Sequence, residues 1–348
     1  MILDPVLDLL RGKAITIPPL DGAFRPNTAL EQAGVLARCP APDGLAVAGG
    51  RLLVSSGSRV LSVDGLAEVA SFEAPATALA AEEGGAAAVG LENGRIALLG
   101  ASSDIAGFKC PVALAFDGPQ TLYVCNGSER NAPSKWATDL MQGGTSGSLW
   151  RVDLAGGSRT CLASGLAFPY GLFLDKVRDR IVVSECWRHR LIAIPIAGGA
   201  PSPIVSKLPG YPARLAPRVN GGALLALFAP RNRLIEMVLR EDAYRTDMMV
   251  EIDPRYWIAP SLSASRSFLE PLQSGGVRVM GIHKPWAPSR SYGLVAELDG
   301  DFQPIASHHS RADGHRHGVT SAIEHDGRIL AASKGGDMVL ALPGASAP

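Results

Sequence analysis

The stretch FPYGLFLDKVRDRIVVSECWRHRLIAIPI, residues 168–196, decides the fold. It contains three short apolar runs, GLFL, RIVVSE and RLIAIPI, separated by polar, turn-forming residues at intervals too short for helices. This pattern predicts an antiparallel meander. The opening Pro169-Tyr170-Gly171-Leu172 has counterparts that begin at Pro42, Pro75, Pro111 and Pro212, so the sequence repeats this meander.

The spacing of the repeats predicts the architecture. Units that start at 42, 75, 111, 169 and 212 have the period of propeller blades once an insertion in the third unit is removed. The last unit has only three predicted strands, and an N-terminal strand near Ala14 to Pro18, after a short helix at residues 4–12, can supply the fourth. We therefore predict an all-β fold, a single six-bladed β-propeller domain over residues 1–348, closed by an N-terminal strand.

Two helical or irregular insertions interrupt the repeat. Residues 128–147, in the third blade, carry Trp136 and a predicted helix near Ser134 to Met141. Residues 231–290, in the fifth blade, begin with a helical pattern, RLIEMVLREDAYRTDMMV, and continue as an irregular segment. If both insertions lie over one face, they form a lid with aromatic walls; if they face outward, they form the surface of a homodimer.

Composition limits the partners. Among 348 residues, 39 glycines and 26 prolines with only 19% charged residues indicate short strands joined by tight turns. A formal charge of zero, without a long Lys/Arg block, argues against nucleic acid or an anionic membrane and favours a small molecule. No apolar run is long enough to span a bilayer.

The N-terminus and the cysteines predict a cytoplasmic protein. The first apolar stretch contains Asp4 and Asp8 and no basic leader, which is not typical of a signal peptide. The five cysteines form no CxxC pair and are predicted to be buried, reduced thiols. They are Cys39, Cys110, Cys125, Cys161 and Cys186.

Several motifs resemble those of the strictosidine synthase-like family. They are Phe168-Pro169-Tyr170-Gly171, Val183-Ser184-Glu185 with Trp187-Arg188-His189-Arg190, the junction at 208–212, and His317-Gly318 followed by Glu324-His325-Asp326-Gly327. That family belongs to a wider group of six-bladed propellers that includes gluconolactonases and paraoxonases. The resemblance covers most of the chain from about Pro42 and implies a site in the central channel, although function depends on the site and not on the scaffold.

The resemblance also indicates what the channel has lost. Lactonase relatives hold a calcium-type cation with oxygen side chains at the starts of inner strands. The corresponding positions here are Asp43, Val112, Tyr170 and Ala213, of which only Asp43 is a suitable ligand, so we expect no metal and no organic cofactor. Strictosidine synthase is metal-free and uses a glutamate on the last inner strand, where this chain has Thr320, which cannot shuttle protons near neutral pH.

The remaining candidates are side chains predicted at the channel mouth. Tyr170, Asp43 and Glu185 are potential acid/base groups, and His317 lies just before the channel-facing turn of the last blade. Each of the three also has a structural alternative, since Tyr170 can fill the hub, Asp43 can cap a turn and Glu185 can pair with a neighbouring arginine. Arg214 can clamp a carboxylate or an oxyanion. The predicted substrate-binding residues are Arg214, Thr320, Asn126, Phe228, Trp187 and Lys334.

Three functions remain open. The leading hypothesis is a metal-independent, strictosidine synthase-like enzyme that performs acid/base condensation, addition or elimination on a small aromatic or anionic molecule. The second is a metal-dependent lactonase or esterase of the gluconolactonase type, which would recruit calcium through Asp43 and water. The third is a propeller that binds a metabolite or a partner protein without catalysis. The sequence has no GxSxG, HExxH or P-loop motif that would support other common hydrolase or nucleotide-binding functions.

Overall fold

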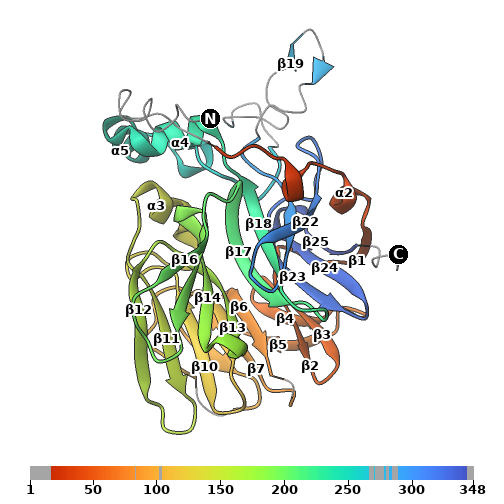
Figure 1. The fold of residues 1–348 in the computed structure, drawn as a ribbon, viewed down its shortest axis with the longest axis vertical. Helices are drawn as coiled ribbons and strands as arrows, with labels where there is room; N and C mark the ends of the chain where they lie inside the picture. The colour runs from red at the N-terminus through yellow and green to blue at the C-terminus, as the bar shows by residue number, and fades with distance from the viewer. Residues whose placement is uncertain are drawn as a thin grey trace.

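The protein is a six-bladed β-propeller in the computed structural model (Figure 1). The structure describes residues 17–82, 84–101, 104–265, 270, 278, 279, 282, 283 and 289–342. Six antiparallel sheets form the ring, and the first strands of neighbouring blades contact one another around the channel. The predicted all-β fold and the number of blades are therefore confirmed.

The blades follow the predicted repeat in chain order. The first three consist of β2 (Pro42–Ala48), β3 (Arg51–Ser56), β4 (Arg59–Ser62) and β5 (Glu68–Ser71); β6 (Ala76–Ala81), β7 (Ala87–Leu91) and β8 (Ile96–Leu98); and β9 (Pro111–Phe116), β10 (Thr121–Asn126), β11 (Gly147–Asp153) and β12 (Arg159–Leu166). The last three consist of β13 (Pro169–Asp175), β14 (Arg180–Glu185), β15 (Arg190–Pro195) and β16 (Ser202–Val205); β17 (Gly210–Pro217), β18 (Ala223–Pro230), β21 (Leu294–Leu298) and β22 (Pro304–His309); and β23 (Val319–His325), β24 (Arg328–Ser333), β25 (Met338–Ala341) and β1 (Gly34–Arg38).

The strand that closes the ring is β1, and not the segment near Ala14 to Pro18. β1 pairs antiparallel with β25, so an N-terminal strand does complete the sixth blade as predicted. The expected helix at 4–12 and residues 14–16 lie outside the described residues, and Ile17 and Pro18 are not in a strand. Pro18 and Pro19 have no amide hydrogen to donate to a ladder, whereas residues 34–38 contain no proline.

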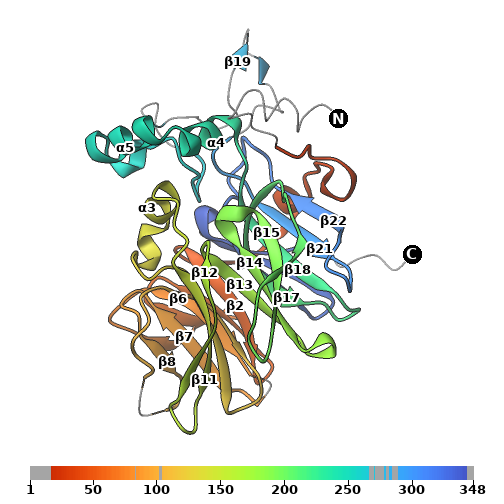
Figure 2. The same ribbon diagram turned by 60° about the vertical axis from the view of Figure 1, so that its left-hand side comes forward.

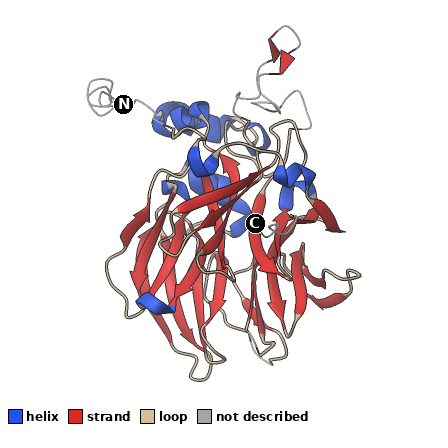
Figure 3. Cartoon of the chain, turned by 45° about the vertical axis from the view of Figure 1, so that its right-hand side comes forward, coloured by secondary structure: helices blue, strands red, loops and turns tan. Residues whose placement is uncertain are grey.

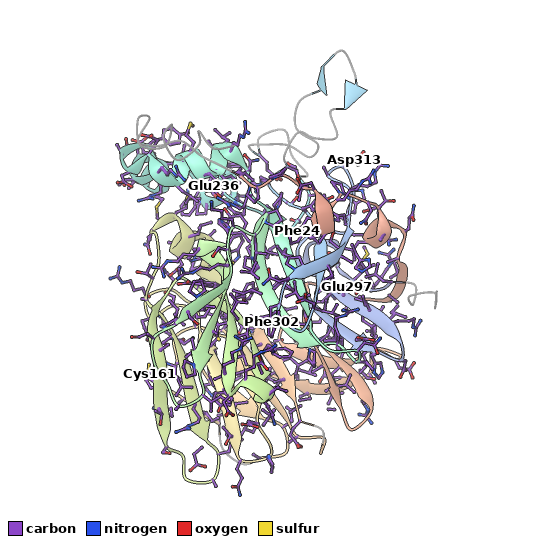
Figure 4. All side chains as sticks on the ribbon, in the orientation of Figure 1. Phe24, Cys161, Glu236, Glu297, Phe302 and Asp313 are labelled. Atoms are coloured by element: carbon purple, nitrogen blue, oxygen red, sulfur yellow. The ribbon has the colours of Figure 1, made fainter. Side chains whose placement is uncertain are left out.

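The core consists of apolar layers between adjacent blades. Because side chains alternate between the two faces of a strand, each blade packs one set against each neighbour. Phe302, labelled in Figure 4, lies in the layer between the fourth and fifth blades, where its ring centroid is 5.2 Å from that of Phe173. Four cysteines are buried, but Cys161 is exposed, so the prediction of buried thiols fails there.

Most of the helices lie at one end of the ring (Figures 2 and 3). The first insertion contains the turn η2 (Pro133–Lys135) and α3 (Trp136–Met141), as predicted. The second contains α4 (Arg233–Arg240), α5 (Asp242–Glu251), the turn η5 (Pro254–Tyr256) and the short strands β19 (Arg278–Val279) and β20 (Ile282–His283). The shorter elements elsewhere are η1 (Gly22–Phe24), α2 (Ala29–Gln32), η3 (Lys176–Arg178), η4 (Cys186–Arg188) and η6 (Lys334–Gly336). Within the described ranges, no helix has the length and apolar character needed to cross a membrane.

Candidate functional site at the propeller hub

Every inner strand carries an irregularity where it enters the channel. Near the start of each inner strand, the pairing with the second strand of the same blade skips one or more residues. An extra residue of this kind leaves the ladder and directs its polar groups elsewhere, which here is toward the channel axis. The skipped positions include Asp43, Thr77, Val112, Tyr170, Arg214 and Thr320.

These six positions form the hub of the propeller, and Arg214 fills its centre. Its Nη1 donates to Asp43 Oδ1 at 2.8 Å and to the backbone oxygens of Asp43 and Thr320 at 3.2 and 3.4 Å. Its Nη2 donates to the backbone oxygens of Thr77 and Val112 at 2.6 and 3.1 Å. These acceptors come from the first, second, third and sixth blades, and Arg214 itself belongs to the fifth.

The fourth blade contributes the ring of Tyr170. Its centroid is 5.1 Å from the Cζ atom of Arg214, a cation–π distance, so the side chain of Arg214 contacts residues of all the other blades. Thr320 adds a further bond, because its hydroxyl donates to the backbone oxygen of Asp43 at 2.8 Å. The six inner strands are thus tied together at one cation.

A second cation lies on the other oxygen of the same carboxylate. Lys334 Nζ donates to Asp43 Oδ2 at 3.0 Å. Burial disfavours the carboxylate form of Asp43, but Arg214 and Lys334 outweigh burial and hold the pKa of Asp43 well below its usual range. Burial and the charge of Asp43 raise the pKa of Tyr170 well above that of an exposed phenol. At neutral pH the hub therefore holds a carboxylate and a neutral phenol.

A cavity of about 400 Å³ opens above the hub. Trp136 and Leu262 come from the two insertions and line the same cavity, which corresponds to the lid alternative for these segments. The homodimer remains a prediction. The lining residues are Asp43, Pro75, Ala76, Thr77, Glu92, Val112, Pro133, Ser134, Trp136, Phe168, Tyr170, Trp187, Phe228, Leu262 and Lys334.

The roof formed by the first insertion is anchored to two blades. Both carboxylate oxygens of Glu92, in the second blade, accept from the backbone amide of Ser134, at 3.1 and 3.0 Å. On the opposite side, the indole Nε1 of Trp187 donates to Asp139 Oδ1, on α3, at 2.8 Å. Between these anchors the ring of Trp136 packs 5.4 Å from that of Phe228.

The channel continues below Arg214 as a second chamber of about 620 Å³. Its walls are residues further along the inner strands, among them Leu45, Leu114 and Leu215. Arg214 lies between this chamber and the upper cavity and is only 7% exposed. The guanidinium and its bonded carbonyls therefore divide the channel into two compartments.

Half of the predicted site residues line the upper cavity. Asp43 and Tyr170, predicted to be catalytic, lie at its floor, and Trp187, Phe228 and Lys334, predicted to bind substrate, form its walls. Arg214 and Thr320 are part of the hub beneath.

The structure places Asn126, Glu185 and His317 in structural contacts outside this cavity. Glu185 accepts from Arg188 at 2.6 Å and Arg190 at 2.5 Å, which is the ion-pair alternative. Asn126 Oδ1 accepts from the amide of Cys110 at 2.6 Å. His317 is buried, with Nδ1 2.8 Å from Ser291 Oγ and Nε2 2.7 Å from the backbone oxygen of Arg311.

Sequence reasoning missed Glu92, Thr77 and Phe168. Glu92 directly follows the second strand of its blade, the region that singled out Asn126 and Glu185 in the next two blades. The weak, alanine-rich second repeat hid this correspondence. Thr77 occupies the skipped position of the second blade, and aligning the second repeat with the other repeats would have identified it.

With Arg214 in place, the hub residues do not fit a calcium ion. Asp43 is the only carboxylate there, Val112 and Ala213 have no side-chain oxygen, and Arg214 and Lys334 already bring two positive charges to Asp43. Elsewhere in the described part of the chain, no group of three or more His, Cys, Asp or Glu side chains could hold a metal ion.

The comparisons with known proteins show the fold. No family model matches the sequence, and no curated protein matches it. A gluconolactonase from Xanthomonas campestris superposes with a TM-score of 0.56 and 14% identity, over 89% of this chain and 88% of that chain. A structural-genomics target assigned to the gluconolactonases gives a TM-score of 0.54 and 11% identity, over 89% and 90% of the two chains. The chain thus has the six-bladed propeller fold of the gluconolactonase type, and these likenesses do not single out the strictosidine synthase-like group.

Proposed function

We propose that the protein is a metal-independent hydrolase that cleaves an ester or lactone bond of a small molecule bound above the hub. The observation that carries this proposal is Lys334, an ammonium held by Asp43 at the floor of a cavity with aromatic walls. The fold shared with proteins described as gluconolactonases supports hydrolysis over condensation.

Lys334 is the cation that can face a ligand. The four Nη hydrogens of Arg214 are directed at protein oxygens, whereas the side chain of Lys334 is 28% exposed and lines the cavity. An ammonium placed beside a carbonyl oxygen stabilises the negative charge that develops there when water attacks. Tyr170 stays protonated and adds a hydroxyl donor on the same floor.

Glu92 is the proposed general base. The carboxylates among the described residues that line the cavity are Asp43 and Glu92, and Asp43 is paired with two cations. Among the described residues, Glu92 has no ion pair, and its only hydrogen-bond donor is the Ser134 amide. It would take a proton from water as the water oxygen bonds to the carbonyl carbon; the ester C–O bond then breaks, and the leaving oxygen takes up the proton.

The cavity walls indicate the substrate class. Phe168 stacks on Trp187 with ring centroids 4.5 Å apart, and Trp136, Tyr170 and Phe228 complete an aromatic enclosure. Such walls favour a substrate with an aromatic or other apolar body and a single carbonyl or anionic group for Lys334.

The acid/base condensation expected from the sequence, with Asp43 and Tyr170 as the groups that transfer protons, has less support. Proton transfer near neutral pH needs a group whose pKa lies near that pH, but the pKa of Asp43 is held far below it and that of Tyr170 far above it. Because the pKa values of Asp43 and Tyr170 both lie far from neutral pH, they favour a second candidate, a propeller that binds an aromatic anion without catalysis.

A hydrolysis assay with matched variants tests the proposal. Aryl esters and aromatic and aliphatic lactones are assayed after exhaustive treatment with a chelator. We expect chelation to leave hydrolysis unchanged, Lys334→Met to lower kcat/KM by about 10²-fold or more, and Glu92→Gln to lower it by about 10²-fold or more. Lys176→Met, a change of a lysine outside the upper cavity, is the control. Activity that is lost on chelation and restored by calcium would contradict the proposal. Ligands that shift the melting temperature but are never hydrolysed would favour the binding candidate.

A further inference from the structure

The hub gathers more oxygen acceptors than its strands can satisfy. The backbone oxygens of Asp43, Thr77, Val112 and Thr320 point to one place, together with the Asp43 carboxylate. A buried carbonyl without a partner is unfavourable, and a cluster of carbonyls around one carboxylate is the type of ligand set that binds hard cations. This arrangement needs a positive charge at its centre.

The chain supplies that charge from its own fifth blade. The guanidinium of Arg214 lies at the centre of the cluster, and the Asp43 carboxylate at 2.8 Å balances its charge. Burial lowers the pKa of Arg214, but the carboxylate of Asp43 and the nearby Tyr170 outweigh it and raise the pKa above the usual value. Arg214 is therefore charged at neutral pH.

We propose that Arg214 is a built-in hub cation, and that the oxygens around it form a latent cation site. Removing the arginine side chain would open a site for a free cation, with a small guanidinium ion as the best fit. A planar guanidinium can donate to several carbonyls at once, as Arg214 does, whereas a spherical ion would rely on one carboxylate and the same carbonyls. In the native protein no chelator can extract this cation, because it is covalently attached. This latent site lies in the hub and does not depend on ester hydrolysis in the cavity above it.

The test is rescue of Arg214→Ala by added cations. The variant removes one of the two cations on Asp43 and leaves the converging backbone oxygens without their donor, so its melting temperature should fall by roughly 4 to 7 °C. Methylguanidinium at low millimolar concentration should restore at least half of this loss in a saturable manner, while equal concentrations of sodium chloride should not. The wild type should show no saturable response. The double variant Asp43→Asn/Arg214→Ala should not be rescued, because the balancing carboxylate is gone.

A calcium series in parallel distinguishes the kinds of cation. Rescue of Arg214→Ala by calcium as well as methylguanidinium supports the latent site, and rescue by methylguanidinium alone supports it with selectivity for a planar ion. If Arg214→Ala does not fold, its refolding yield from urea with and without methylguanidinium gives the same readout. Failure of every cation to raise either quantity would overturn the proposal. So would saturable calcium binding by the wild type that Asp43→Asn abolishes.

Discussion

Replacing Asp43 by asparagine should destabilise the protein strongly. Asp43 is 4% exposed, and its carboxylate bonds Arg214 at 2.8 Å and Lys334 at 3.0 Å. Asparagine keeps the shape but leaves the guanidinium buried without a counter-charge, which costs about 3 to 5 kcal/mol of unfolding free energy. The unfolding entropy of a 348-residue chain is about 0.7 kcal/mol/K at roughly 2.1 cal/mol/K per residue, so the melting temperature should fall by roughly 4 to 7 °C.

The matched control is Asp175→Asn. Asp175 is also buried, and Arg180 Nε is 2.8 Å from its Oδ2, but the side chains of Arg178 and Arg180 are 42% and 23% exposed. Water can solvate these cations once the carboxylate is neutralised, so the expected loss is about 1 kcal/mol. Urea unfolding of both variants measures the difference. If Asp43→Asn loses no more stability than Asp175→Asn, the ion pair between Asp43 and Arg214 does not stabilise the hub more than a partly exposed ion pair would.

Three further predictions concern other parts of the fold. Tyr211→Phe should stabilise the protein by about 1 kcal/mol in urea unfolding, because the fully buried hydroxyl of Tyr211 has no hydrogen-bond partner among the described residues; a loss of stability would argue that the hydroxyl is bonded. Burial, with a smaller effect of His308, lowers the pKa of His309 to about 4, so the folded state binds fewer protons and stability should fall as pH decreases from about 6.5 to about 4. His309→Gln should flatten that slope, and an unchanged slope would refute the assignment. Trp136→Ala removes an aromatic wall and should weaken binding of any aromatic ligand by about tenfold in calorimetry, an effect of about 1.4 kcal/mol; unchanged affinity would place the ligand elsewhere.

The fold was predictable because its signal is repeated and local. The Pro-initiated meanders occur often enough that a weak second repeat and two long insertions did not hide the six blades. The closing strand was misplaced because its partner, β25, lies about 300 residues away in the chain, and no local pattern distinguishes residues 34–38 from an earlier apolar segment. Only the pairing in three dimensions identifies it.

The site was predictable in part, because its residues follow a structural position and not a motif. The starts of inner strands identified Asp43, Tyr170 and Arg214, but their mutual bonds could not be deduced. Arg214 was expected as a substrate clamp, since nothing in the sequence indicates that four backbone oxygens from other blades converge on its guanidinium. Glu185 has the same residue type as a catalytic acid, yet two adjacent arginines neutralise it.

The identity of the central cation is the most direct test of this account. A crystal structure of the wild-type protein grown with excess calcium would show the hub at atomic detail. We predict planar density for the Arg214 guanidinium, bonded to Asp43 and to the carbonyls of Thr77 and Val112. A calcium ion at that position, with the Arg214 side chain displaced from the channel axis, would contradict the account.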